Sequence, residues 1–176
     1  VLDKMKKPGI ESYERFADVF CQASEAAGKE QYLVPYFITG HPGSTLTDTI
    51  ALARYLKRNG LRPRQIQDFI PTPMAVATAM YHTGIDPLSG DPVPVVRDLR
   101  EKRMLKALIL WWDDKQWPLA REALKKAGRS DLIGRGPECL VPWSGESSGA
   151  TRPSPRGKAQ PGRAFQRPPR KPARRS

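Results

Sequence analysis

The chain has 176 residues, of which 39% are hydrophobic and 27% charged, a composition that suits a soluble globular protein with one sizeable domain. Its longest purely apolar run, residues 107–112, is far shorter than the roughly 20 residues that cross a bilayer, which excludes a transmembrane helix. The formal net charge is +12, yet residues 144–176 hold nine basic side chains against one acid. Most of the excess charge therefore lies on that stretch and not on the body, residues 1–143.

Two cysteines, Cys21 and Cys139, lie 118 positions apart, so their spacing predicts neither a disulfide framework nor a cysteine-rich metal site. Reduced thiols and a cytoplasmic location are expected. The first residues carry no apolar signal core and no initiator methionine, which suggests the later part of a longer protein.

The first predicted helix covers residues 11–29, where apolar side chains recur at three- and four-residue steps and Gly28 ends the pattern. Residues 31–39 are nearly continuously apolar, which is typical of a strand covered on both faces in a parallel sheet, although Pro35 removes one ladder donor. A second helix should run from 46 to 59, because residues 45–48 resemble a capping box. A second strand at 65–70 begins 34 residues after the first, a separation that suits a parallel strand–helix–strand crossover.

The second half of the body should be mostly helical. Residues 74–82 can form a short helix, and residues 85–96 contain three prolines and one glycine, which predicts a loop or a short hairpin. Helices are expected at 99–112 and at 118–127, the latter with proline at its first position. Residues 144–176 have six prolines, four glycines and almost no apolar residues, which predicts a disordered basic tail.

Ligands of open parallel sheets and barrels bind beyond the carboxyl ends of the strands. Here those ends are residues 39–43 and 69–73. Gly40 and Gly43 would let a ligand approach the backbone, and the start of the following helix favours a carboxylate or phosphate. A plain tight turn into a helix explains the same residues. The glycine patterns of triphosphate and dinucleotide sites are absent from the sequence.

Five separated motifs resemble consecutive landmarks of the YgiQ-type radical SAM proteins. They are residues 1–10 (VLDKMKKPGI), 31–43 (QYLVPYFITGHPG), 67–73 (QDFIPTP), 80–87 (MYHTGIDP) and 127–134 (AGRSDLIG). The resemblance implies an α/β fold, in which residues 1–84 form the C-terminal part of a partial (β/α)6 radical SAM barrel. Residues 85–143 would be the family's mostly helical C-terminal extension, followed by the tail at 144–176.

The same resemblance implies an enzyme that binds a [4Fe-4S] cluster and S-adenosylmethionine and cleaves the latter to a 5′-deoxyadenosyl radical. The cluster's C-x3-C-x2-C loop is absent from this sequence, and two distant cysteines cannot replace it. We therefore expect no metal ligand here and a chain that is inactive alone, whose partner is the missing N-terminal half of the barrel. The substrate cannot be read from the sequence.

In radical SAM barrels, the ends of the fifth and sixth strands line the adenine and ribose pocket, and the matching positions here are Ile38, Gly40, Phe69 and Ile70. A role for the three apolar residues as barrel core is the alternative. His41 and Asp68 are weak catalytic candidates. His41 could instead order its turn, and Asp68 could face solvent or point into the barrel.

The tail suggests a function of another class, a non-catalytic nucleic-acid-binding module near RNA or the ribosome, with no membrane partner. A solvated tail and a half-barrel that pairs with itself are further alternatives. The tail residues that would contact phosphates are Arg152, Arg156, Lys158, Arg163, Arg167, Arg170, Lys171, Arg174 and Arg175.

Overall fold

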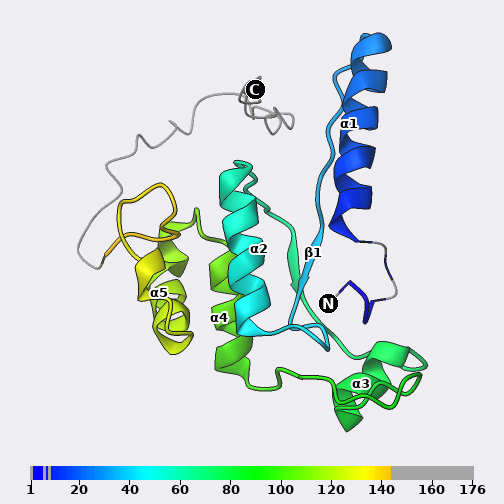
Figure 1. Ribbon diagram of the computed structural model, residues 1–176, viewed down its shortest axis with the longest axis vertical. Coiled ribbons are helices and arrows are strands. Elements are labelled where there is room, and N and C mark those ends of the chain that lie inside the picture. The colour runs from blue at the N-terminus through cyan, green and yellow to red at the C-terminus, as the bar shows by residue number, and fades with distance from the viewer. Residues whose placement is uncertain (1, 6, 8, 144–176) are drawn as a thin grey trace, which may run out of the picture. The chain divides into compact units, whose positions relative to one another are not determined.

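The computed structural model describes residues 2–5, 7 and 9–143 (Figure 1). These residues divide into two compact units, one with residues 2–5, 7 and 35–143 and one with residues 9–34. Each unit is described separately. The predicted tail, 144–176, lies outside the described residues, and the proposed division at 84 and 143 stays a prediction.

The smaller unit is one helix, α1 (Ile10–Ala26), followed by residues without regular structure. The predicted helix at 11–29 is thus confirmed, with an earlier end. Gly28 has φ +61°, the left-handed conformation that terminates helices, and the Lys29 N–H returns to the Ser24 carbonyl. The rings of Phe16 and Phe20 contact each other on one side of the helix, with centroids 6.1 Å apart.

The larger unit contains two parallel strands, β1 (Phe37–Thr39) and β2 (Ile66–Asp68). Their register pairs Phe37 with Ile66 and Thr39 with Asp68. Both strands are shorter than the predicted ranges 31–39 and 65–70. The parallel pairing and the crossover between the strands are as predicted, and the ladder begins only after Pro35, which has no N–H to donate.

The crossover helix α2 (Leu46–Arg58) begins where the sequence pattern placed it. Thr45 Oγ1 accepts from the Asp48 N–H at 3.1 Å, and the Asp48 carboxylate accepts from the Thr45 N–H at 3.0 Å. This reciprocal pair is a capping box, which satisfies two amides that a helix leaves without partners. The cap therefore fixes the start of α2, with six residues between the end of β1 and its first residue.

Three more helices follow β2: α3 (Val76–Thr83), α4 (Leu99–Ile109) and α5 (Trp117–Lys126). Short 3-10 turns lie at η1 (Asp114–Gln116) and η2 (Ser130–Leu132). The segment predicted as a loop or short hairpin forms one antiparallel bridge, between Ile85 and Pro92. No described helix is long and apolar enough to span a lipid bilayer.

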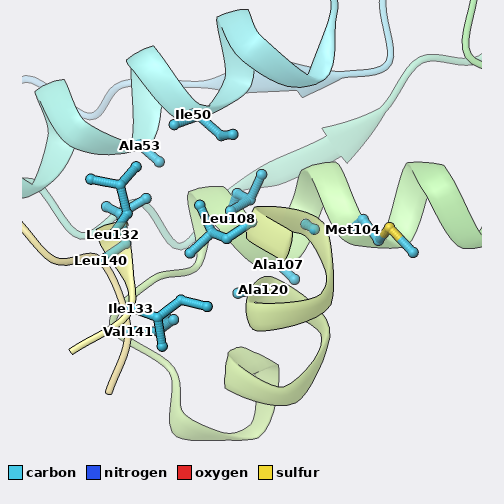
Figure 2. Close-up of a cluster of buried hydrophobic side chains, with 12 residues drawn as sticks. Ile50, Ala53, Met104, Ala107, Leu108, Ala120, Leu132, Ile133, Leu140 and Val141 are labelled. Atoms are coloured by element: carbon cyan, nitrogen blue, oxygen red, sulfur yellow. The ribbon is translucent and has the colours of Figure 1, made fainter. Parts of the chain in front are cut away.

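The core lies between α2, α4, α5 and the segment that follows η2 (Figure 2). Ile50 and Ala53 from α2 face Leu108 of α4, and Ala120, Ala123 and Leu124 of α5 close the other side. Leu132, Ile133, Leu140 and Val141 complete the cluster, and a parallel bridge joins Ile133 to Val141. Removing these side chains from water is the main contribution that holds the helices together.

The two faces of the sheet differ, which corrects the expectation of a strand covered on both faces. Thr39 is buried and its partner Asp68 half-buried, on the face where Lys106 of α4 approaches the strands. On the opposite face, Ile38 is 38% exposed and Gln67, its pairing partner, is also exposed. The described fold is thus mixed α/β with a two-stranded parallel sheet, open on one face.

Candidate functional site

The turn after β1 brings the first candidate residues to the carboxyl end of the sheet. Gly40 is buried with φ +67°, and Gly43 has φ +87°, a region that favours glycine. The Gly43 N–H donates to the Pro94 carbonyl at 2.9 Å, while the hydroxyl of Ser44 donates to the His41 carbonyl at 2.6 Å. The turn is therefore held by one hydrogen bond within itself and by one to the loop after α3.

His41 lies inside this turn and is only 6% exposed. Its Nδ1 is 2.8 Å from the Pro42 carbonyl oxygen, so Nδ1 carries the hydrogen, because a carbonyl can only accept. Burial lowers the pKa of His41 below its usual value of 6.5, against an opposing effect of the Pro42 hydrogen bond. This geometry suits a neutral imidazole that orders the turn, and the catalytic role stays a prediction.

Four rings form a row that starts at His41. The rings of His41 and Phe69 make a T-shaped contact, with centroids 5.1 Å apart, and Phe69 contacts Tyr81 of α3 at 5.6 Å. Tyr81 in turn meets His82 edge-on at 5.6 Å. The row joins the turn after β1, the residue after β2 and the end of α3, so it sets the position of Phe69 at the strand end.

Two cations surround Tyr81. Lys102 Nζ of α4 donates to the Tyr81 hydroxyl at 3.1 Å and lies 5.0 Å from the ring centroid. The Arg97 guanidinium lies 6.0 Å from the same centroid and donates to the carbonyls of Tyr81 and His82 at 2.9 Å. Lys102 also passes Gly40, where an added Cβ would lie 3.8 Å from Lys102 Cγ.

We call His41, Phe69, Tyr81 and Lys102 the strand-end cluster. Tyr81 and Lys102 were not among the site residues predicted from the sequence. Tyr81 lies in the fourth motif, residues 80–87, which could have drawn attention to it. The signal for Lys102 is weaker: Lys102 and Lys106 lie one helical turn apart, so both fall on one side of α4.

Asp68 lies on the face that α4 approaches. The Thr39 hydroxyl donates to its carboxylate at 2.7 Å, and Lys106 Nζ lies 3.7 Å from the other carboxylate oxygen. Asp68 thus lies on the helix-facing side of the sheet with its side chain 45% exposed, and its catalytic role stays a prediction.

The four residues predicted to line an adenosyl pocket lie at one end of the sheet but differ in exposure. Ile38 and Ile70 are 38% and 62% exposed, whereas Phe69 is half-buried in the ring row. Within the described part of the chain, no backbone–backbone hydrogen bond uses the N–H or C=O of Gly40 or Ile70. Exposed apolar side chains beside unused backbone groups are what an adenine ring requires.

Two of the sequence motifs meet through a buried ion pair. Lys4 Nζ, from the first motif, lies 2.9 Å from the carboxylate of Asp86, from the fourth, and Asp86 is fully buried. This hydrogen bond to Asp86 raises the pKa of Lys4. The pair ties residues 2–5 to the loop after α3.

The residues present do not fit an iron–sulfur cluster. Cys21 and Cys139 are both free and half-buried, one in each unit. Among the described residues, no group of three His, Cys, Asp or Glu side chains could hold a metal ion. Cys139 Sγ is 3.6 Å from the Asp131 carbonyl oxygen, a distance that suits a thiol contacting backbone. The nucleic-acid contacts predicted in the tail lie outside the described residues.

Comparison with known proteins defines the class. A family model described as "Domain of unknown function (DUF3362)" matches residues 64–175. The chain is 49% identical over 171 residues to a UPF0313 protein of Bradyrhizobium diazoefficiens, covering 90% of this chain and 25% of the relative. It is 53% identical over 146 residues to one of Pseudomonas aeruginosa (80% and 20%) and 49% identical over 141 residues to one of Methanosarcina mazei (80% and 22%). No solved structure matches.

The chain thus carries a DUF3362 domain. It belongs to the YgiQ/UPF0313 family, which confirms the resemblance noted in the sequence. The chain spans a fifth to a quarter of the length of the relatives named above.

Proposed function

We propose that the chain is the C-terminal part of a radical SAM enzyme whose strand ends bind the adenosyl group of S-adenosylmethionine. The observation that carries the proposal is the parallel pairing of β1 and β2, whose register, continued one residue past Thr39 and Asp68, sets Gly40 beside Phe69, with Ile70 one residue further along. Within the described residues, no backbone–backbone hydrogen bond uses Gly40 or Ile70. The resemblance of five ordered motifs and the family membership support it.

In this proposal, the cluster belongs to the N-terminal part of a longer protein, because the described residues offer no cluster site. The cofactor pair would supply reductive cleavage of a carbon–sulfur bond. The role of this chain would be to receive the adenine ring between Ile38 and Ile70 and to hold the ribose near Gly40. The strand-end cluster keeps Phe69 in place beneath that ring.

A matched pair of glycine variants tests the binding site. Gly40 and Gly60 have φ values of +67° and +66°, so an alanine at either position costs the same backbone strain, about 1 kcal/mol. A Cβ at Gly60 meets nothing within 4 Å, and one at Gly40 makes only an ordinary contact with Lys102. Any difference between the two variants therefore reports on a ligand at Gly40.

The measurement uses a full-length UPF0313 protein that carries this sequence, reconstituted without oxygen. S-adenosylhomocysteine, which cannot be cleaved, is titrated by calorimetry, and formation of 5′-deoxyadenosine is followed separately. Gly40→Ala should weaken binding at least tenfold, while Gly60→Ala should bind like the wild type. Equal binding by both variants would contradict the proposed binding site. A reconstituted protein that never forms 5′-deoxyadenosine would contradict the proposed reaction.

The present chain provides a second test. Reconstituted alone with iron and sulfide, it should form no stoichiometric [4Fe-4S] cluster, because iron–sulfur clusters need several thiolates. A stoichiometric cluster spectrum on this chain would contradict the assignment of the cluster to the missing part.

A further inference from the structure

The positive charge of the body is concentrated in one segment. Residues 49–67 contain five basic side chains and no acidic one, whereas the rest of residues 1–143 contains 16 basic and 17 acidic side chains. The segment covers most of α2 and the connection from α2 to β2. The net charge of the folded body therefore originates in this part of its surface.

Two of these cations share one carboxylate. The guanidinium groups of Arg54 and Arg58, one turn apart on α2, lie 2.9 Å and 2.5 Å from the same oxygen of Glu138. Their hydrogen bonds, that of Arg58 first, lower the pKa of Glu138 to about 2, so the carboxylate is ionised at neutral pH. Glu138 thus marks a place where two guanidinium groups converge on an oxyanion.

Two other cations are held against an indole. Lys57 Nζ lies 5.3 Å from the ring centroid of Trp111, and the Arg62 guanidinium lies 5.8 Å from it. Lys57 also donates to the Cys139 carbonyl, next to Glu138. Cations fixed in this way lose less side-chain freedom when they meet an anion. The shared partners bring these four cations together. Arg64, two residues after Arg62, is exposed on the same connection, and we call Arg54, Lys57, Arg58, Arg62 and Arg64 the basic face.

The composition of this surface decides between partners. An interfacial membrane site needs exposed apolar anchors, but no large hydrophobic side chain between Ile38 and Ile70 is exposed. Four of the five basic residues in the segment are arginines, whose planar forks match phosphate oxygens.

We propose that the basic face binds the phosphodiester backbone of a single-stranded nucleic acid, with Glu138 as the internal anion that the phosphates compete against. This site is independent of the proposed adenosyl site and of the tail.

The first test removes three exposed charges. In the full 176-residue chain, Arg58, Arg62 and Arg64 are replaced by Gln, and binding of a fluorescent RNA of about 20 nucleotides is measured at salt concentrations from about 50 to 200 mM. Each phosphate contact contributes about −0.7 to the slope of log K against log salt concentration. The slope should therefore become shallower by about 2, and binding at 0.1 M salt should weaken ~100-fold.

Two triple variants are matched controls. One replaces Arg103, Lys115 and Lys125, which are exposed elsewhere on the body. The other replaces Arg167, Arg170 and Arg174 in the tail. Both lose the same charge as the first variant. The body control should keep the wild-type slope, since its charges lie outside the basic face. A loss of slope in the body control as large as in the basic-face variant overturns the location.

Glu138→Gln is a test that damage to the fold cannot imitate, because it should strengthen binding. Releasing Arg54 and Arg58 from their carboxylate should steepen the slope by about 0.7 and tighten binding about 5-fold at 0.1 M salt. Glu122→Gln is its control, because Glu122 holds a single arginine, Arg100, away from the basic face.

Four results overturn the proposal. They are no RNA binding by the wild-type chain, unchanged binding after the Arg58, Arg62 and Arg64 replacements, weaker binding after Glu138→Gln, and equal competition by poly-glutamate of the same charge. The last result would assign the surface to an acidic protein.

Discussion

Replacement of Leu108 tests the packing of the larger unit. It is fully buried and belongs to the cluster that unites α2, α4, α5 and residues 132–141 (Figure 2). Replacement by Ala removes three carbon atoms from a site that close-packed neighbours surround, which leaves a cavity as well as losing burial. Leu108→Ala should lower the free energy of unfolding by about 3–5 kcal/mol.

Leu99→Ala is the matched control. Leu99 begins the same helix but is 69% exposed, so the identical substitution should change the free energy of unfolding by less than about 0.5 kcal/mol. Urea unfolding followed by circular dichroism measures both variants, and the Tm of Leu108→Ala should fall by about 10 °C or more. A loss below about 1 kcal/mol at Leu108, or equal losses in both variants, would refute the assignment of the core.

Three further predictions concern the turn and the crossover helix. Because burial places the pKa of His41 below its unfolded value of about 6.5, the unfolded chain binds more protons, and stability should decline as pH falls below about 6.5. In a His82→Gln variant, the one remaining imidazole resonance should titrate below 6.5, and a midpoint at or above 6.5 contradicts this. Thr45→Ala should lower the free energy of unfolding, measured in urea, by about 1 kcal/mol, because the helix cap is lost. Thr47→Ala, on the exposed side of α2, should leave the free energy of unfolding nearly unchanged. Gly43→Ala should be insoluble or destabilised by more than about 1 kcal/mol in thermal unfolding, because its φ is +87° and its Cβ would lie 2.9 Å from a lysine side chain.

Local patterns were sufficient to predict the helices. The start of α2 followed from Thr45 and Asp48, two residues whose effect is confined to one turn. The strands were predicted too long, because a run of apolar and β-branched residues indicates burial and not pairing. Ladder formation requires a partner strand, and β2 provides only three paired residues.

The site was predictable only where it depends on the backbone. Gly40 could be identified because a turn after a strand needs a residue with positive φ. The contact between Tyr81 and Lys102 joins α3 to α4 across 21 residues, and no local pattern encodes which side chains meet there. The exposure of Ile38 was likewise unpredictable, because it depends on which face α4 covers.

The geometry of α2 separates the two proposed sites. The helix starts just after the turn that holds Gly40 and ends at Arg58, so its 13 residues place the basic face about 20 Å along the helix axis from the strand ends. One ligand could reach both only if it spanned that length, which corresponds to about six stacked nucleotides at 3.4 Å each. Gly40→Ala should therefore leave the salt slope of RNA binding unchanged, and the replacement of Arg58, Arg62 and Arg64 should leave S-adenosylhomocysteine binding unchanged. If each change disturbed both measurements, the two sites would have to be one, and a longer nucleic acid that occupies both ends of α2 would replace the two separate ligands.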